Sequence, residues 1–307
     1  MKHDTAGDPM TGLKWTRRTT GKIAKELRSL GIQISRTTVG KLLKGMKYSL
    51  RVNHKKLGPA GHRDRDAQFA HIGDLRERFA QEGDPIISVD TKKKEKVGSF
   101  KNPGTAWNRE PVLVNDHDFA SRAIGKAIPY GVYDMQANRG SIFVGTSHDT
   151  ATFAVESIEK WWRYDGQRRH PGAKQLLVLA DGGGGNGSRC RAWKRGIQEK
   201  LCDRYGLSVT VSHYPPGASK WNPIEHRLFA EVSKNWAGEP LDSYEKTLNH
   251  IRTTETTTGL KVKAYLVSKH YAKGVKVSDD EMSQLCITTD TTLPQWNYTL
   301  SPTENGK

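Results

Sequence analysis

Apolar residues recur at helical spacing in three stretches near the start of the chain. They predict a helix from Thr19 to Leu30 that Gly31 ends, and a second helix that Ser35 caps. A third, amphipathic helix is predicted from Ala67 to Gln81. The side chains expected to face inward are Ile23, Ala24, Leu27 and Leu30, then Val39, Leu42, Leu43 and Met46, then Phe69, Ile72, Leu75 and Phe79.

The first two helices, joined by a tight turn, predict a helix-turn-helix within residues 1–50. A recognition helix presents polar and basic residues of its first turns to the major groove of DNA. The candidates here are Arg36, Thr37, Thr38 and Lys41. An ordinary helical hairpin with a solvated basic face fits this segment equally well. A basic, glycine-containing stretch follows, so residues 51–83 are expected to form a linker and a helix.

From Asp84 onward, short apolar runs alternate with longer periodic stretches. They predict strands at 85–90, 98–101, 130–134, 141–145, 175–180 and 207–213, and helices at 149–162, 188–205 and 221–236. Hairpin strands followed by alternating helices and strands imply an α/β fold, a mixed sheet with helices on its faces. This is the element order of the ribonuclease H-like fold, which we expect over residues 84–240.

The remaining residues, 241–307, are expected to form a C-terminal extension. A helix is predicted at 241–254 and a strand at 261–266. Residues after Thr289 are predicted to be a loop with a frayed end.

Three acidic residues stand where the predicted elements end or begin. Asp90 ends the first strand, Asp181 follows the central apolar strand, and Glu225 lies about one turn into a helix. If the two strands are neighbours, their ends bring both carboxylates together, and a helix crossing that edge adds the third. Hard oxygen ligands of this kind suit Mg²⁺ or Mn²⁺, and two such ions can clamp an in-line displacement at phosphorus. Any one of these acids alone is more often a turn former or helix cap.

The charge of the chain indicates a class of binding partner. The 307 residues carry a formal net charge of +16, which predicts attraction to polyanions such as DNA. A merely soluble basic protein or a ribosome-associated protein has a similar charge. Three widely spaced cysteines, without a CxxC pair, indicate neither a disulfide framework nor a zinc site. Neither a transmembrane run nor a secretory signal is expected.

Several residues near the three acids are candidates for contacts with DNA. Lys92, Lys93 and Lys94 follow the first acid and are expected at the rim of the site, although charge runs are commonly solvated surface. Around the third acid the candidates are Lys220, Trp221 and Arg227; Trp221 is either a core residue or a platform for an unpaired base. His213 and His226 are expected to be core or surface histidines, and Asp134 a turn residue.

The glycine run from Gly182 to Gly187 allows two interpretations. It lacks the lysine of a nucleotide-binding P-loop. The glycines could let a DNA backbone approach the metal site, or they could form a flexible turn that opens the next helix.

Long sequence blocks around the acids resemble a known family. The blocks VDTKKKE at 89–95, ADGGGGNGS at 180–188 and SKWNPIEHRLF at 219–229 are similar to the three acidic blocks of the Rhodopirellula-type (ISAzo-type) insertion-sequence DDE transposases. Further similar segments are KAIPYGVYD at 126–134, HDTATFAVESI at 148–158 and WNY at 296–298. The resemblance extends from about residue 10 to about residue 300.

This resemblance implies a ribonuclease H-like core in which Asp90, Asp181 and Glu225 bind two Mg²⁺ or Mn²⁺ ions. The implied activity is metal-dependent cleavage and strand transfer of an insertion sequence, with terminal inverted repeats and target DNA as partners and a homo-oligomer on DNA. The alternatives are a non-catalytic DNA-binding remnant and a ribonuclease H-like nuclease without strand transfer. A cytoplasmic, nucleoid-associated bacterial protein is expected. Family members usually carry further sequence before the Trp15–Thr16 segment, so an incomplete DNA-binding region is also expected.

Overall fold

The structure is a computed structural model, which describes residues 5–7, 14–16, 19–49, 63–106, 108–218 and 221–303. The chain divides into two compact units, Met1–Gly58 and Pro59–Lys307. Most of the predicted linker, residues 51–62, and the candidate Lys220 lie outside the described residues. Among the described helices, none has the length and apolarity to cross a membrane.

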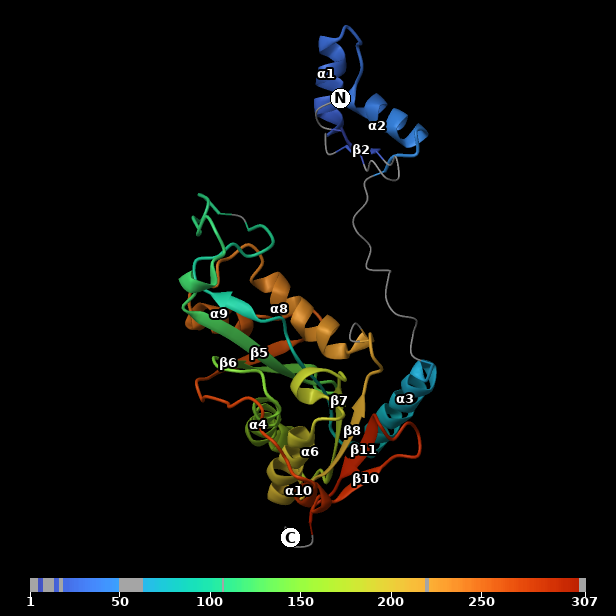
Figure 1. Cartoon of the computed structure of the whole chain (residues 1–307), viewed down its shortest axis with the longest axis vertical. Coiled ribbons are helices and arrows are strands. Elements are labelled where there is room, and N and C mark those ends of the chain that lie inside the picture. The colour runs from blue at the N-terminus through green and yellow to red at the C-terminus, as the bar shows by residue number, and fades with distance from the viewer. Residues whose placement is uncertain are drawn as a thin grey trace. The chain divides into compact units, whose positions relative to one another are not determined.

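The first unit contains the two predicted helices, α1 (Thr20–Ser29) and α2 (Arg36–Gly45), as Figure 1 shows. The side chain of Thr19 accepts a hydrogen bond from the backbone N–H of Lys22, and Ser35 caps α2 in the same way through Thr38. A short antiparallel pair, β1 (Thr5–Gly7) and β2 (Lys14–Thr16), precedes them.

The contact between α1 and α2 is narrower than the sequence pattern predicts. Only Ile23, Ala24 and Val39 are buried, with Leu27, Ile34 and Leu43 partly buried against them. The inward orientation predicted for Leu30, Leu42 and Met46 is wrong, because all three are exposed. The two ten-residue helices bury only a narrow stripe against each other, so apolar side chains outside that stripe stay exposed.

The second unit is built on a mixed sheet. Its five central strands are β3 (Ile86–Thr91), β5 (Gly125–Asp134), β6 (Arg139–Gly145), β7 (Gln175–Ala180) and β8 (Ser208–His213), arranged in the order β6-β5-β3-β7-β8. Strand β5 is antiparallel to both β3 and β6, whereas β7 is parallel to β3 and to β8. This order and these directions are those of the ribonuclease H-like fold, so the predicted fold class is confirmed.

Segments outside the predicted core complete the nine-stranded sheet of the described residues. Strand β9 (Lys261–Val267) lies beside β6, and β11 (Asn297–Leu300) pairs with β8, with β10 (Ile287–Thr289) beyond it. The prediction of a loop after Thr289 is therefore wrong for β11. The hairpin partner of β5 is β4 (Glu95–Val97) rather than the predicted strand at 98–101. Residues 241–307 thus supply strands to both margins of the core sheet.

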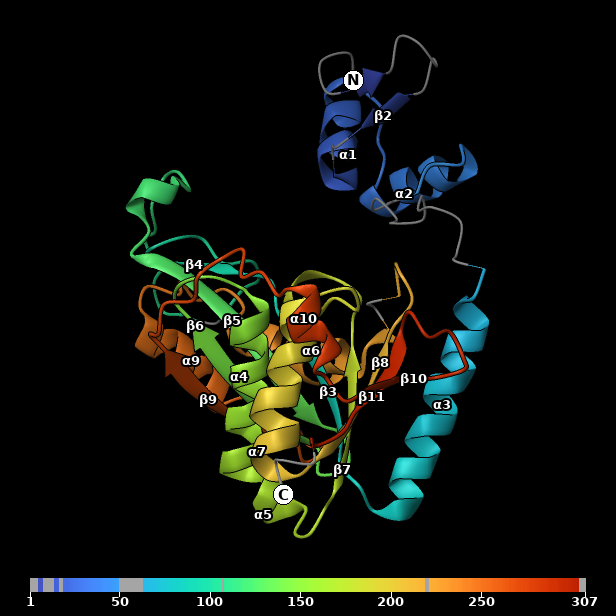
Figure 2. The same ribbon diagram turned by 60° about the horizontal axis from the view of Figure 1, so that its bottom comes forward.

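Helices cover both faces of this sheet. One face carries α4 (Ala151–Trp161), which continues through a π-helical turn (Trp162–Gly166) into α5 (Gln167–Arg169), and α6 (Arg191–Ile197), which continues through another (Gln198–Cys202) into α7 (Asp203–Tyr205). The other face carries α3 (Arg65–Glu82), α8 (Ala230–Asn235) and α9 (Tyr244–Arg252). The short α10 (Asp279–Ser283) lies near α6 (Figure 2).

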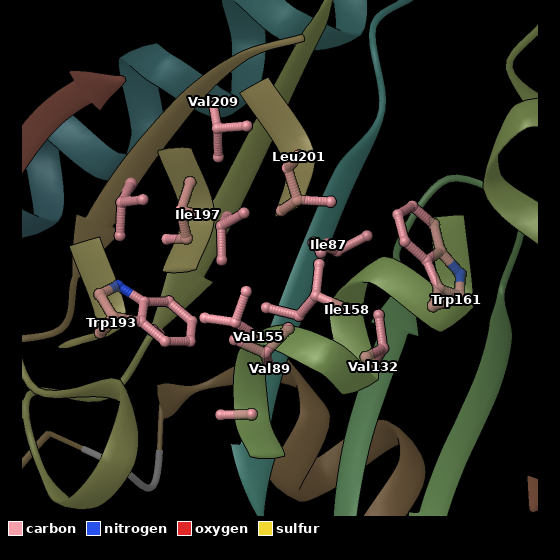
Figure 3. Packing of buried hydrophobic residues seen from close by; sticks show 14 of the residues in the cluster. Ile87, Val89, Val132, Val155, Ile158, Trp161, Trp193, Ile197, Leu201 and Val209 are labelled. Carbon is pink, nitrogen blue, oxygen red and sulfur yellow. The ribbon is translucent and has the colours of Figure 1, made fainter. Parts of the chain in front are cut away.

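The largest core cluster lies between the sheet and the pair α4 and α6. Figure 3 shows Ile87, Val89, Val132 and Val209 of the sheet packing against Val155, Ile158, Trp161, Trp193, Ile197 and Leu201 of the helical layer. Alternation along β3 directs Ile87 and Val89 into this cluster, and therefore turns Ser88 and Asp90 toward the opposite face. That face carries α8, which follows the third acidic residue in the chain.

Candidate active site

Two of the three predicted acids lie side by side at the ends of neighbouring strands. Strands β3 and β7 are parallel, and their register places Val89 beside Ala180. Asp90 and Asp181 are the next residue along each strand, so they meet at the same edge of the sheet. Asp90 is buried and Asp181 is half-buried.

Glu225 reaches this edge because a buried polar clamp attaches its helical segment to β3. The Ser88 hydroxyl donates to the side-chain oxygen of Asn222 and accepts from the backbone N–H of Ile224, at 3.1 Å. The Asn222 amide also donates to the carbonyl oxygen of Val89, at 3.4 Å. Ser88 and Asn222 are both fully buried. The clamp therefore fixes the start of the segment one turn before Glu225 and two residues from Asp90.

Two glycines of the sheet allow this segment to approach closely. A Cβ atom added to Gly131, the register partner of Asp90, would lie 2.6 Å from the Phe229 ring. A Cβ atom on Gly140 would collide with Leu228. Glu225–Phe229 forms a π-helical turn, a local widening that frequently occurs at functional sites. The glycines and the turn together set the depth at which Glu225 lies.

The carboxylates influence one another strongly. Burial, followed by repulsion from Asp181, raises the pKa of Asp90 to about 8, and Glu225 and Asp149 add to the effect. Burial also raises the pKa of Asp181 and that of Glu225. A hydrogen bond with Asp90 and the positive charge of Lys92 act in the opposite direction on Glu225. Neighbouring buried carboxyl groups repel one another when they ionise. A divalent cation offsets that repulsion, so such a cluster favours its binding.

Asp149 is a fourth carboxylate at this site, and the sequence pattern predicted only that a helix begins there. The cap of α4 is Thr150, the next residue. Asp149 accepts a hydrogen bond from the Thr91 hydroxyl at 3.1 Å and pairs with Lys94, also at 3.1 Å. Its charge contributes to the raised pKa of both Asp90 and Asp181. The sequence signal was present, since Asp149 lies between the last hairpin strand and the first core helix.

Lys92 does not lie at the rim where it was expected. The residue is only 7% exposed, its amine lies 4.5 Å from the centroid of the Trp236 ring, and it pairs with Glu95 at 3.4 Å. Burial lowers the pKa of Lys92. Lys92 follows the end of β3 and turns inward against Trp236, whereas Lys93 and Lys94 are exposed. Of the three lysines, Lys93 and Lys94 are therefore the ones whose side chains reach solvent.

The glycine run is packed against the start of α4. A Cβ atom on Gly185 would lie 2.9 Å from the carbonyl carbon of Thr150, so only glycine fits there without a shift. The next residue, Asn186, is buried and accepts a hydrogen bond from the Tyr130 hydroxyl at 3.0 Å. This side of the run is a tightly fitted turn, whereas Gly182, Gly183 and Gly184 are exposed beside Asp181.

The remaining candidates for DNA contact lie on several different elements. Trp221 is 42% exposed, with the Arg65 guanidinium 4.5 Å from its ring centroid and Phe69 edge-on at 5.9 Å. Arg227 and His226 are exposed. In the first unit, Arg36, Thr37, Thr38 and Lys41 are exposed on α2, as predicted.

Two further predicted residues have structural surroundings. Asp134 is buried at the far end of β5, where it contacts His170 at 3.0 Å and accepts from the Ala137 N–H, as a turn residue would. His213 is a fully buried core histidine whose ring contacts the backbone carbonyl of Asp181 at 3.1 Å, and burial lowers its pKa to about 4. A neutral His213 therefore adjoins the site without entering it.

The residues present fit a divalent cation in their chemistry. Asp90, Asp181, Glu225 and Asp149 are all hard oxygen donors, and their mutual repulsion is what a cation would relieve. Among the described residues, no group of three or more His, Cys, Asp or Glu side chains is already arranged as a metal cage. Mg²⁺ sites commonly use one or two carboxylates and complete their shell with water and substrate phosphates, so an incomplete cage agrees with such an ion.

Comparison with known proteins identifies the family. The family model described as Rhodopirellula transposase DDE domain matches residues 1–302. The chain belongs to this DDE transposase family. The resemblance found in the sequence is thereby confirmed, and it covers nearly the whole of this transposase-family chain.

Solved structures of the Mos1 transposase are similar at a distance. A paired-end complex with the left transposon end has 17% identity and a TM-score of 0.43, and the match covers 74% of this chain and 63% of that one. A strand transfer complex has 16% identity and a TM-score of 0.43, covering 75% and 63%. The chain therefore spans less than two thirds of the length of these Mos1 chains. No curated protein compared with the chain matches it.

Proposed function

We propose that this member of the DDE transposase family is a polynucleotidyl transferase that cleaves DNA at the ends of an insertion sequence and joins the freed ends to target DNA. The observation that supports this most directly is the convergence of Asp90, Asp181 and Glu225 at one edge of a ribonuclease H-like sheet, where burial and then mutual repulsion raise the pKa of Asp90 to about 8.

In this proposal the three acids would hold two Mg²⁺ or Mn²⁺ ions. When bound, such ions lower the pKa of an attacking water or hydroxyl and offset the charge that develops on the leaving oxygen. Asp90 and Asp181 come from rigid neighbouring strands, and Glu225 from a helical turn clamped by Ser88 and Asn222. This rigid support holds the carboxylates in one geometry through both the cleavage and the joining step.

DNA would enter over the exposed cations at this edge. Lys93 and Lys94 would contact phosphates, as would Arg227 and Lys220, and Trp221 would provide an aromatic face for an unpaired base. The exposed Arg36, Thr37, Thr38 and Lys41 of α2 would bind the terminal inverted repeats. Two ends must be handled together, so the active species would be a homo-oligomer on DNA.

The test is cleavage of a DNA fragment that carries the ends flanking the coding region, with and without Mg²⁺ or Mn²⁺. We expect metal-dependent cleavage by the full chain, and cleavage at background level for Asp181→Asn with DNA affinity retained. Glu231→Gln is the matched control, because Glu231 follows Glu225 on the same helical segment but pairs with Lys234 at 2.6 Å. Cleavage by Asp181→Asn at the level of the unchanged chain would overturn the assignment of the acids.

A second assay separates the proposed activity from its alternatives. A pre-cut end is incubated with plasmid, and joined products are counted. Joined products support a transposase, whereas cleavage without any joining favours a ribonuclease H-like nuclease. DNA binding without either reaction would indicate a non-catalytic remnant.

A further inference from the structure

A chain of buried hydrogen bonds runs from the C-terminal strand to the active-site edge. The indole Nε1 of Trp193 lies 3.0 Å from the hydroxyl of Tyr298, and this hydroxyl lies 3.2 Å from Nε2 of His213. The Nδ1 atom of His213 lies 3.1 Å from the backbone carbonyl oxygen of Asp181. The exposed fraction of Trp193, Tyr298 and His213 is 1% or less, so water does not compete for their hydrogen bonds.

The chemistry of the four groups fixes the position of each hydrogen. A carbonyl oxygen can only accept, so Nδ1 of His213 must carry a hydrogen and donate it to Asp181. The neutral ring then has a bare Nε2, which accepts the hydrogen of the Tyr298 hydroxyl. An indole N–H can only donate, so Trp193 donates to the remaining lone pair of Tyr298. All three hydrogen bonds therefore point the same way, from Trp193 through Tyr298 and His213 to the Asp181 carbonyl.

The carbonyl that accepts from His213 belongs to Asp181, whose carboxylate accepts a long hydrogen bond from the Gly183 N–H at 3.4 Å. The regular pairing of β7 ends at Ala180, whose carbonyl oxygen accepts from the Tyr214 N–H at 2.8 Å. Asp181 follows, and after it come Gly182, Gly183 and Gly184, which are exposed and restrict the backbone least. The bond from His213 holds the peptide plane that joins Asp181 to this flexible segment.

We propose that Tyr298 and His213 are positioning residues that orient the carboxylate of Asp181 through its own backbone carbonyl. The inference rests on the proposed function, in which Asp181 holds a divalent cation. Rotation of the Asp181 peptide would move its carboxylate relative to Asp90 and Glu225. The series of hydrogen bonds from Trp193 through Tyr298 and His213 prevents this rotation. None of these three side chains needs to contact the substrate to do so.

The register of β11 is what brings Tyr298 to this position. Tyr298 lies opposite Val211 and Asn297 lies opposite Ser212, two residues and one residue before His213. The buried Asn297 amide donates to Gln68 at 2.7 Å and accepts from Ser212 at 2.6 Å, which locks the strand against β8 and α3. A slip by one residue would turn Tyr298 to the opposite face. The WNY segment at 296–298 thereby acquires a role, in which Asn297 sets the register and Tyr298 supplies the hydroxyl.

The experiment compares Tyr298→Phe with Thr299→Val in the full chain. Tyr298→Phe keeps the ring and removes only the hydroxyl. Thr299→Val removes a hydrogen bond of the same strand pair, to Thr210 at 3.0 Å, which has no path to Asp181. Mn²⁺ binding is measured by calorimetric titration, and DNA affinity by fluorescence anisotropy in metal-free buffer. For Tyr298→Phe we expect Mn²⁺ affinity to fall about 10-fold or more, as for other residues that orient metal ligands, with DNA affinity unchanged.

A substitution of His213 tests the same link from the other side. In His213→Asn the side-chain amide can still donate toward the Asp181 carbonyl, whereas His213→Val cannot. We expect the Asn variant to retain more Mn²⁺ affinity than the Val variant. Equal losses in both would show that the imidazole acts only as packing, and would overturn the proposal.

The outcomes separate this proposal from the proposed function. If the unchanged chain binds Mn²⁺ and Tyr298→Phe binds it as tightly as Thr299→Val does, the positioning role is wrong and the transposase proposal stands. If the unchanged chain neither binds Mn²⁺ nor cleaves DNA, the proposed function fails. The ¹⁵N spectrum of His213 then still tests the positioning role. A protonated Nδ1 and a shifted Gly182 amide in Tyr298→Phe support it, and an unmoved Gly182 amide refutes it.

Discussion

Replacing Asp90 with asparagine should make the metal-free protein more stable. The buried carboxyl of Asp90 has a pKa of about 8, whereas an aspartate in an unfolded chain has a pKa of 3.8. At pH 7 folding must therefore keep a proton on a group that would otherwise lose it. At about 1.4 kcal/mol per pKa unit, this costs folding about 4 kcal/mol. Asparagine carries no such cost, and its side-chain oxygen can still accept the Thr91 N–H, which lies 2.7 Å from Asp90 Oδ1.

The sign of the pH dependence follows from the same pKa values. Between about pH 4 and pH 8 the folded state binds a proton at Asp90 that the unfolded state has released. The free energy of unfolding contributed by this group therefore falls as pH rises through that interval. Asp90→Asn should remove this slope, so its advantage should shrink toward pH 4 and reach up to about 4 kcal/mol near pH 7. Mg²⁺ should stabilise the unchanged protein and leave Asp90→Asn unaffected.

The assay is urea unfolding in metal-free buffer from pH 4.5 to pH 8, followed by tryptophan fluorescence. Trp15 is the only one of the eight tryptophans that precedes residue 59, so the signal reports mainly on the second unit. Asp134→Asn is the matched control, because that buried carboxylate contacts His170 at 3.0 Å and its neutralisation should destabilise the protein. Destabilisation of both variants, or equal pH slopes for Asp90→Asn and the unchanged chain, would refute the argument.

Three further substitutions test individual contacts. Gly185→Ala should cost about 1–3 kcal/mol because its Cβ would lie 2.9 Å from backbone, whereas Gly73→Ala, with open space around it, should be neutral or stabilising; equal effects in thermal unfolding would contradict this. Ser88→Ala should cost about 2–4 kcal/mol because two buried groups lose their partner, whereas Ser157→Ala should cost less than about 1 kcal/mol; similar losses for both variants in urea unfolding would contradict this. Lys94→Gln should weaken DNA binding and lower the salt dependence by about one phosphate contact, and an unchanged slope in an anisotropy salt series would exclude that contact.

The sequence by itself predicted the elements and the three acids. Apolar runs fixed β3 and β7, and a helical period fixed α4, because these patterns reflect burial along one short segment. The ends of such segments are also local, so Asp90 and Asp181 could be placed at strand ends before any sheet was known. Ser35 was predicted as a helix cap for the same reason, since its partner lies three residues away.

The tertiary structure alone decided how distant segments meet. Ser88 and Asn222 form one clamp across 134 residues, and Tyr298 contacts His213 across 85 residues. Neither pair has a periodic signal, so the strand formed by Asn297–Leu300 was predicted as a loop. The direction of Lys92 likewise depended on the presence of Trp236 beneath it. Local patterning determines which residues can form a strand or helix, whereas burial of a polar or charged side chain depends on partners that only the folded chain brings close.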